Sequence, residues 1–398
     1  MQMRDFQQIN RRLLRHVAVF RALQLGDMLA TVPALRALRM ALPEATISLI
    51  GLPWACTFVE RFGNYLDRLI EFPGFPGLPE CELEIGAIPA FLSRMQEERF
   101  DLVLQMHGSG GITNPLVVLF GAKQVAGFYL PGQFCPDPTR FLSYPPNDPE
   151  IAVHVRLMQF LGVPPQGMHL EWPLGEDDRG ELGMLAAHHG LQRGGYVCVH
   201  PGAQLASRRW PVDRFAAVAD ALAARGLRVV LTGTAGEAHL TRAVAAAMQA
   251  PAVDLAGQTS LGSLGALVES ARLIVCNDTG VSHVAAALRV PSVVIASGSD
   301  VARWRPLDHE RHRVLWHDTD CRPCAYSVCP IGHSCALGVS VQSVLREADD
   351  LLACDSFPPT SDEPIHNRAH SSRSSEVDSD DRSDGSSATT VGSIPWRW

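Results

Sequence analysis

The sequence of 398 residues lacks several features that mark membrane, secreted and nucleic-acid-binding proteins. No uninterrupted apolar run approaches the roughly 20 residues that a membrane-spanning helix requires. The start of the chain is polar and its first apolar run is short, unlike a secretory signal. No basic face is broad enough to suggest nucleic acid as a partner. We therefore expect a cytoplasmic protein that binds no nucleic acid.

What is present is typical of a soluble globular protein. Hydrophobic residues make up 46% of the chain and charged residues 19%, with a formal net charge of -8. The length is enough for two domains with sizeable cores. Basic residues gather near the start, which indicates either a solvated helix or contact with an anionic membrane surface. These residues are Arg4, Arg11, Arg12, Arg15 and His16.

Strand-length apolar runs alternate with helical patterns twice along the chain. In the first series we expect strands at 16–23, 46–52, 67–72, 100–106 and 125–130, and helices at 28–42, 54–62 and 149–161. In the second series we expect strands at 195–203, 227–233, 252–257, 273–276 and 291–297, and helices at 212–225, 235–249, 261–270, 279–288 and 340–353. Such alternation predicts an α/β protein with parallel sheets covered on both faces.

The two series predict two doubly wound, Rossmann-like domains facing a cleft. We place the first domain at residues 1–170 and the second at 171–354, joined near 165–190. Residues 355–398 contain mostly Ser, Asp, Arg and Pro, a composition that buries too little to fold, so we expect a disordered tail. Proline-rich loops at 73–79 and 131–149 should flank the cleft, where ligands usually bind.

The segment 273–288, LIVCNDTGVSHVAAAL, joins a buried strand to an alanine-rich helix. Unpaired N–H groups and the helix dipole at such a turn favour an anion, for example a diphosphate. Asp278, Thr279 and Gly280 form the turn, and His283 follows in the helix. Two simpler interpretations stay open: Asp278 caps the helix, and His283 is a hydrogen-bonded core residue.

A second turn follows the first expected strand, at Gly26 and Asp27. Asp27 stands where a helix N-cap is expected, and capping alone explains an Asp there. The alternative is a carboxylate that faces the cleft as a general base.

Two further turns follow strands of the second series. His200, Gly202 and Ala203 precede Arg208 and Arg209, whose guanidinium groups suit phosphate oxygens but are equally compatible with a solvated pair. In the next turn, Thr232 and Gly233 precede Glu237. That carboxylate either stabilises the start of the following helix or binds ribose hydroxyls.

Together these turns resemble glycosyltransferase family 9, the ADP-heptose:lipopolysaccharide heptosyltransferases. The resemblance covers roughly residues 15–350 and rests on LGDMLATVPALRALR at 25–39, HPGA at 200–203, SRRWPVDRFAAVADAL at 207–222 and NDTGVSHVAAAL at 277–288. It implies the GT-B fold, with an acceptor-binding N-terminal domain and a nucleotide-sugar-binding C-terminal domain. It also implies an inverting transfer of heptose from an ADP-sugar to a hydroxyl of the lipid-anchored inner core, beside the cytoplasmic face of the inner membrane.

The resemblance gives each turn a role. Asp27 matches the family's general base, and Arg208 would counter the charge that develops on the departing diphosphate. The donor would be bound by His200, Gly202, Ala203, Arg209, Thr232, Gly233, Glu237, Asp278, Thr279, Gly280 and His283. No metal or other cofactor is required in this fold.

One position departs from the family pattern. Arg208 stands where the family commonly has lysine, and a guanidinium differs from an ammonium in reach and geometry. Two alternatives therefore stay open: a transferase with another donor or with a protein or other glycan as acceptor, and a non-catalytic nucleotide-sugar-binding protein.

Four of the ten cysteines cluster near the end of the second series: Cys321, Cys324, Cys329 and Cys335. A Cys-x-x-Cys pair followed by two more cysteines is compatible with a small tetrahedral metal site. The spacing is tighter than in most zinc modules, so we favour a structural loop with reduced thiols.

Overall fold

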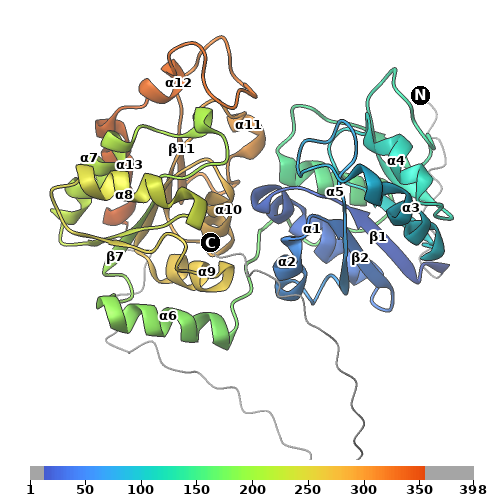
Figure 1. Cartoon of the computed structure of the whole chain (residues 1–398), viewed down its shortest axis with the longest axis horizontal. Helices are drawn as coiled ribbons and strands as arrows, with labels where there is room; N and C mark the ends of the chain where they lie inside the picture. Colours follow the sequence, from blue (N-terminus) through green and yellow to red (C-terminus); the bar gives the residue numbers. More distant parts are fainter. Residues whose placement is uncertain (1–12, 355–398) are drawn as a thin grey trace, which may run out of the picture.

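A computed structural model of the chain describes residues 13–354 as two α/β halves placed side by side (Figure 1). Three of the basic residues near the start, Arg4, Arg11 and Arg12, lie outside the described residues. The expected tail at 355–398 lies outside them as well.

The first half is built on a six-stranded sheet of order β3-β2-β1-β4-β5-β6 in which all pairs are parallel. Its strands are β1 (His16–Phe20), β2 (Thr46–Gly51), β3 (Arg68–Glu71), β4 (Leu102–Gln105), β5 (Val125–Tyr129) and β6 (Phe141–Ser143). Its helices are α1 (Leu25–Ala41), α2 (Ala55–Arg61), η2 (Ile85–Ala87), α3 (Ile88–Glu97), α4 (Thr113–Leu119) and α5 (Glu150–Phe160).

The second half repeats this plan with a parallel sheet of order β12-β11-β10-β7-β8-β9. Its strands are β7 (Tyr196–His200), β8 (Arg228–Leu231), β9 (Ala252–Asp254), β10 (Leu273–Asn277), β11 (Ser292–Ile295) and β12 (His312–Leu315). Its helices are α6 (Glu176–His189), η3 (Ala206–Arg208), α7 (Val212–Ala223), η4 (Ala235–Glu237), α8 (Ala238–Ala247), α9 (Leu261–Ser270), α10 (Gly280–Ala287), α11 (Val301–Trp304), α12 (Ser334–Leu337) and α13 (Val341–Ala353).

The central strands are almost completely buried because helices cover both faces of each sheet. Every residue of β7, β10 and β11 is buried. Such strands read as continuous apolar runs rather than as an alternation, which is why the sequence identifies them clearly. The expected α/β architecture with two doubly wound sheets is confirmed.

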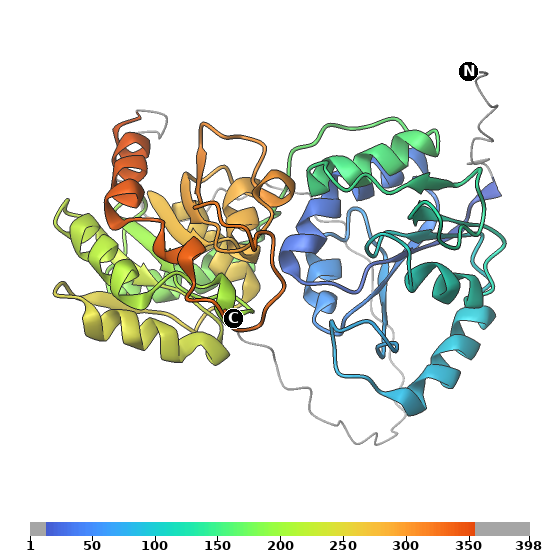
Figure 2. The same ribbon diagram turned by 90° about the horizontal axis from the view of Figure 1, so that it is seen from above.

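The shortest elements differ from the expectation. The segment 131–149, expected to be irregular, contains the edge strand β6. The junction expected near 165–190 contains the helix α6, which packs against α9. In Figure 2 the stretch that follows α5 crosses from one half to the other before it reaches α6. A three-residue strand carries too few positions for a pattern to show.

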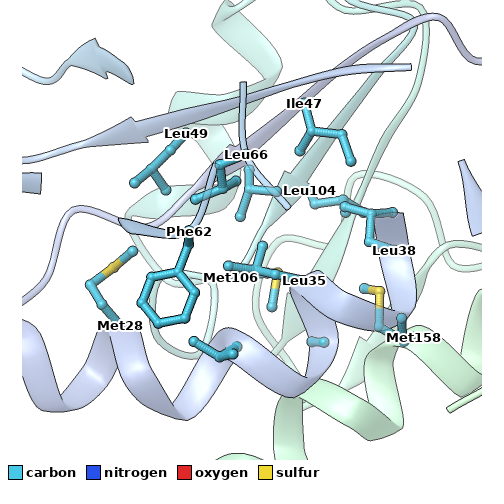
Figure 3. Close-up of a cluster of buried hydrophobic side chains, with 14 of the residues drawn as sticks. Met28, Leu35, Leu38, Ile47, Leu49, Phe62, Leu66, Leu104, Met106 and Met158 are labelled. Atoms are coloured by element: carbon cyan, nitrogen blue, oxygen red, sulfur yellow. The ribbon is translucent and has the colours of Figure 1, made fainter. Parts of the chain in front are cut away.

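One hydrophobic core ties the two halves together. Figure 3 shows side chains from α1, β2 and β4 packed with Phe62 and Met158 beneath the first sheet. The same buried cluster extends into the second half through Leu261 of α9 and Val284 of α10. We conclude that α1 belongs to the core of its own half and also to the contact between the halves.

The strand orders place a switch point in each sheet. From β1 the chain moves outward through β2 and β3, then returns to β4 on the other side of β1. The second half switches in the same way between β7 and β10. Ligands of open α/β sheets bind at the carboxyl ends of the strands at such points. The turns singled out in the sequence follow β1, β7, β8 and β10.

Candidate functional site

The two switch points meet where α1 of the first half contacts α10 of the second (Figure 1). Two glycines permit this contact. A Cβ atom at Gly26 would lie 2.9 Å from His283 Cδ2, and one at Gly280 would lie 3.2 Å from Leu25 Cβ. Without side chains, both helix starts approach more closely than other residues allow. The turns after β1 and β10 therefore form one site.

Asp27 lies inside the first turn of α1 and does not cap it. The N-cap of this helix is Gln24, so the capping interpretation of Asp27 is wrong. Its side chain is 28% exposed, and Oδ1 lies 3.7 Å from Arg21 Nη2. Burial raises the pKa of Asp27, Arg21 opposes the shift and Glu150 adds to it. A carboxylate with a raised pKa accepts a proton more readily than an exposed one, as a general base must.

Arg208 and Arg209 are half-buried rather than solvated, so the interpretation as a solvated pair is wrong. Arg208 lies at the end of η3, and its Nη2 donates to the Cys324 carbonyl oxygen. Arg209 Nε donates to the Ala203 carbonyl oxygen at 2.9 Å. Both guanidinium groups are held beside the turn that follows β7, so less side-chain freedom is lost when an anion binds.

The turns after β7 and β8 pack against each other. His200 Nδ1 lies 3.1 Å from the Thr232 hydroxyl oxygen. Glu237 Oε2 accepts hydrogen bonds from the Thr234 backbone N–H and hydroxyl, both at 2.9 Å, in a capping box. Its expected role at a helix start is therefore confirmed. Gly202 is adjacent, because a Cβ atom there would overlap the Glu237 carboxylate.

Asn277 links these turns to β10, a role that the sequence analysis missed. Its Oδ1 accepts from the Trp210 backbone N–H at 2.9 Å, and its Nδ2 donates to the Pro201 carbonyl oxygen at 2.8 Å. An asparagine that ends a buried strand is itself a signal, because a fully buried amide requires partners. Asn277 is fully buried.

The expectation that Asp278 caps the next helix is wrong, because the N-cap of α10 is Thr279 and no side-chain cap is formed. His283 is 5% exposed, and its Nδ1 has no hydrogen-bond partner within the part of the chain that is described. It is therefore not a fully hydrogen-bonded core residue. Burial lowers the pKa of His283, while Asp278 and Asp27 oppose the shift. An unpartnered nitrogen beside Asp27 suits a polar group of a ligand.

The structure adds side chains to this site that the sequence analysis did not single out. Charges surround Asp27 on three side chains: Arg21 and Glu150, which are buried, and Arg303, which is partly exposed. Ser297 and Ser299, which follow β11, are buried with hydroxyl groups that have no partner among residues 13–354. Arg21 directly follows an apolar strand, which is a readable signal. No local sequence signal marks Arg303, because its partners lie in the other half.

The four clustered cysteines do not form a metal site in the described structure. Within residues 13–354, no group of three or more His, Cys, Asp or Glu side chains is arranged to hold a metal ion. Cys329 Sγ instead accepts from the His333 backbone N–H at 3.2 Å, and His333 Nε2 donates to the Ser207 carbonyl oxygen at 2.8 Å. All four thiols are free. The loop packs on η3 and holds Arg208 through Cys324.

No helix among the described residues is long and apolar enough to cross a membrane.

The chain is similar to heptosyltransferases in sequence. The sequence model of glycosyltransferase family 9 (heptosyltransferase) matches residues 89–334. Lipopolysaccharide heptosyltransferase 3 of Escherichia coli is 31% identical over 169 residues, 42% of this chain and 48% of that protein. The chain thus spans about half the length of that relative. Lipopolysaccharide heptosyltransferase 2 of Escherichia coli (strain K12) is 26% identical over 340 residues, 82% of this chain and 95% of that protein.

A solved structure shares the whole architecture. The ADP-heptose lipopolysaccharide heptosyltransferase II of E. coli superposes with a TM-score of 0.65 at 23% identity, over 85% of this chain and 98% of that chain. Together with the two parallel sheets, this likeness confirms the expected GT-B fold.

Proposed function

The chain belongs to glycosyltransferase family 9 (heptosyltransferase), and on that premise we propose that it transfers heptose from ADP-heptose to a hydroxyl of the lipopolysaccharide inner core with inversion at the anomeric carbon. The observation that carries the proposal is the contact between α1 and α10, which brings Asp27 beside the turn after β10. Two further facts support it: the names of the relatives and the resemblance of the four turns to the family motifs.

In the proposed reaction the acceptor hydroxyl attacks the anomeric carbon of the donor. Asp27 takes the hydroxyl proton as the new C–O bond forms. The bond from the anomeric carbon to the diphosphate oxygen breaks, and its electron pair leaves with ADP. Arg208 and the N–H groups at the start of α10 stabilise the charge that develops on the diphosphate. Cationic and backbone groups supply this stabilisation, so we expect transfer to persist in the presence of a chelator.

We propose that the two halves of the molecule bind different substrates. We assign the N-terminal half, residues 1–170, to the acceptor and the C-terminal half, residues 171–354, to the donor. Glu237 would bind the ribose, exchanging its contact with Thr234 for ribose hydroxyls. His200, Gly202, Ala203, Arg209, Thr232 and Gly233 would surround the nucleotide, and Asp278, Thr279, Gly280 and His283 the diphosphate and sugar. We further propose that the enzyme works in the cytoplasm, beside the inner membrane that carries its acceptor.

Replacing the proposed base tests this function. We expect Asp27→Asn to lower the transfer rate by about 10²–10⁴-fold, because the hydroxyl proton loses its acceptor. The dissociation constant for ADP should stay within about twofold. The assay uses the full chain, ADP-heptose and a heptose-free lipid-anchored core oligosaccharide.

Asp177→Asn is the matched control, since Asp177 is an exposed carboxylate in the first turn of α6. It should transfer at the wild-type rate. Wild-type turnover by Asp27→Asn would reject the base assignment. Tight ADP binding without turnover on any acceptor would favour a non-catalytic nucleotide-sugar-binding protein instead.

Arg208 in place of the family's usual lysine supports one alternative, a different donor. Assays with a panel of ADP-, GDP- and UDP-sugars distinguish ADP-heptose from a different donor. Hydrolysis or transfer restricted to ADP-heptose supports the main proposal, and a preference for a GDP- or UDP-sugar supports the alternative.

A further inference from the structure

One buried carboxylate, Glu150 at the start of α5, binds arginines from both halves of the molecule. Arg21 Nη2, from the end of β1, donates to Glu150 Oε1 at 3.1 Å. Arg303 Nη2, from α11 of the second half, donates to Glu150 Oε2 at 2.5 Å. His154 Nε2 also lies 3.1 Å from Oε1. Because Glu150 is 5% exposed, it needs these partners to remain charged.

Arg21 connects this carboxylate to Asp27. Its Nε donates to the Asp27 carbonyl oxygen at 3.0 Å, and its Nη2 lies 3.7 Å from Asp27 Oδ1. Its Nη1 donates to the Met106 carbonyl oxygen. Arg21 is 1% exposed, so it cannot swing into solvent. Arg21 thus links Glu150 to the first turn of α1.

Arg303 reaches across from the other half. Besides Glu150, it donates to the Tyr144 hydroxyl, and its Cζ lies 5.2 Å from the centroid of the Tyr144 ring. The neighbouring Trp304 ring lies 6.3 Å from the ring of His283. Glu150 and Tyr144 belong to the first half, so Arg303 makes these contacts only when the halves are together. Its side chain is 20% exposed in this arrangement.

We propose that Arg303 is a positioning residue that clasps the two halves through Glu150 and Tyr144 and thereby holds the Asp27 carboxylate, in its charged form, for the transfer step. The proposal rests on the role of Asp27 proposed above. It adds a residue of the donor half that acts on the proton chemistry of the acceptor half.

The charges around Asp27 determine its pKa, which provides a measurable consequence of the contact made by Arg303. Five charged or titratable side chains face it from five elements or their ends: Arg21 after β1, His107 after β4, Glu150 on α5, His283 on α10 and Arg303 on α11. Burial and Glu150 raise the pKa of Asp27, whereas Arg21, His283 and His107 lower it. Arg303 is cationic, so it also acts in the lowering direction.

The central test compares Arg303→Gln with Glu150→Gln. Transfer requires ionised Asp27, so kcat/KM rises with pH through the pKa of this carboxylate. Loss of the Arg303 cation should move this acid limb to higher pH by roughly one unit, and loss of the Glu150 anion should move it to lower pH. Below the limb, Arg303→Gln then transfers about tenfold more slowly than wild type. Arg303→Lys, which keeps the charge, should restore most of the profile.

Arg305→Gln is the matched control, because it removes the same charge from an exposed position two residues away. Its profile should coincide with that of the wild type. An acid limb of Arg303→Gln that coincides with the control overturns the effect on Asp27. Rate losses in both Arg303→Gln and Glu150→Gln without opposite displacements overturn it as well, since that result indicates general damage.

A second measurement tests the clasp without using activity. In small-angle scattering with ADP bound, Arg303→Gln should have a larger radius of gyration than wild type and Arg305→Gln. Equal radii overturn the clasp. Should Asp27→Asn retain transfer, the base assignment fails, yet the scattering comparison still decides whether Arg303 holds the halves together.

Discussion

The two halves share one topology but carry different chemistry at their switch points. The first half places charges at its switch point: Arg21 and Glu150, which are buried, and Asp27, which is partly exposed. The second half lines its switch point with glycine turns, an amide that ties them together and an arginine held by a carbonyl oxygen. Buried charges tune a proton acceptor, whereas turns and helix starts offer N–H donors to an anion. In the proposed mechanism, proton transfer and leaving-group stabilisation are divided between two copies of one fold.

The comparison extends to two carboxylates within the first half. Burial alone would raise the pKa of Glu150, but His154 and Arg21 lower it to about 2. For Asp27, burial outweighs Arg21 and the pKa is raised. The same arginine serves both groups, so what distinguishes them is the number of partners. Glu150 is a structural anion, and Asp27 is left able to take up a proton.

Within the donor half, the largest loss of activity is expected on replacing Arg208. Arg208→Ala should lower kcat by about 10²–10³-fold, because the departing diphosphate loses a preorganised cation. ADP affinity should fall much less, since the added charge develops only during bond breaking. Steady-state kinetics beside calorimetric ADP titration separate the two quantities. Arg242→Ala, at an exposed position of α8, serves as the control. Equal losses in kcat and in ADP affinity would place Arg208 in ground-state binding instead.

The next effect concerns the acceptor half and stability. The pKa of Glu150 is lowered from 4.5 to about 2, so its contribution to folding is fully present above pH 4.5 and is lost as pH falls toward 2. Glu150→Gln should reduce the free energy of unfolding by roughly 3 kcal/mol at neutral pH. The difference from wild type should vanish near pH 2.

Asp27→Asn provides the contrast for that stability measurement. The pKa of Asp27 is raised, so its ionisation opposes folding as pH rises, and Asp27→Asn should be more stable than wild type at neutral pH. Urea unfolding of both variants across pH measures the two slopes. Slopes of the same sign would remove the distinction drawn between these carboxylates.

The smallest expected effect lies at the turn after β7. Gly202→Ala places a methyl group on the Glu237 carboxylate, which is held by Thr234, so the carboxylate must move. We expect ADP to bind about tenfold more weakly, close to the loss of one hydrogen bond to a charged group. Gly236→Ala is the matched control, because its methyl group would meet only Thr234 Oγ1, at an ordinary contact distance of 3.8 Å. Unchanged ADP affinity in Gly202→Ala would argue that Glu237 does not bind the ribose.

The sequence located much of the site because strand ends are local features. Gly202 and Gly280 stand directly after or near buried apolar strands, so their place at a sheet edge follows from the chain alone. The N-caps were not predicted correctly. Asp27 and Asp278 are residue types typical of an N-cap, but the caps are Gln24 and Thr279. Helix boundaries shift by one or two residues with little local signal. For the cysteine cluster we favoured a structural loop over a metal site, and in the fold this loop holds Arg208 through the Cys324 carbonyl oxygen.

The sequence by itself determined the two α/β units, their parallel sheets and the turns at the strand ends, because burial of strands and the period of helices are written in neighbouring residues. Only the tertiary structure decided which charges surround Asp27. Glu150 lies more than a hundred positions from Arg21 and from Arg303, as their separations of 129 and 153 residues show. No local pattern encodes such a pairing, because it depends on how the halves pack through α1 and α10. That packing places Asp27, from one half, beside the turn after β10, from the other.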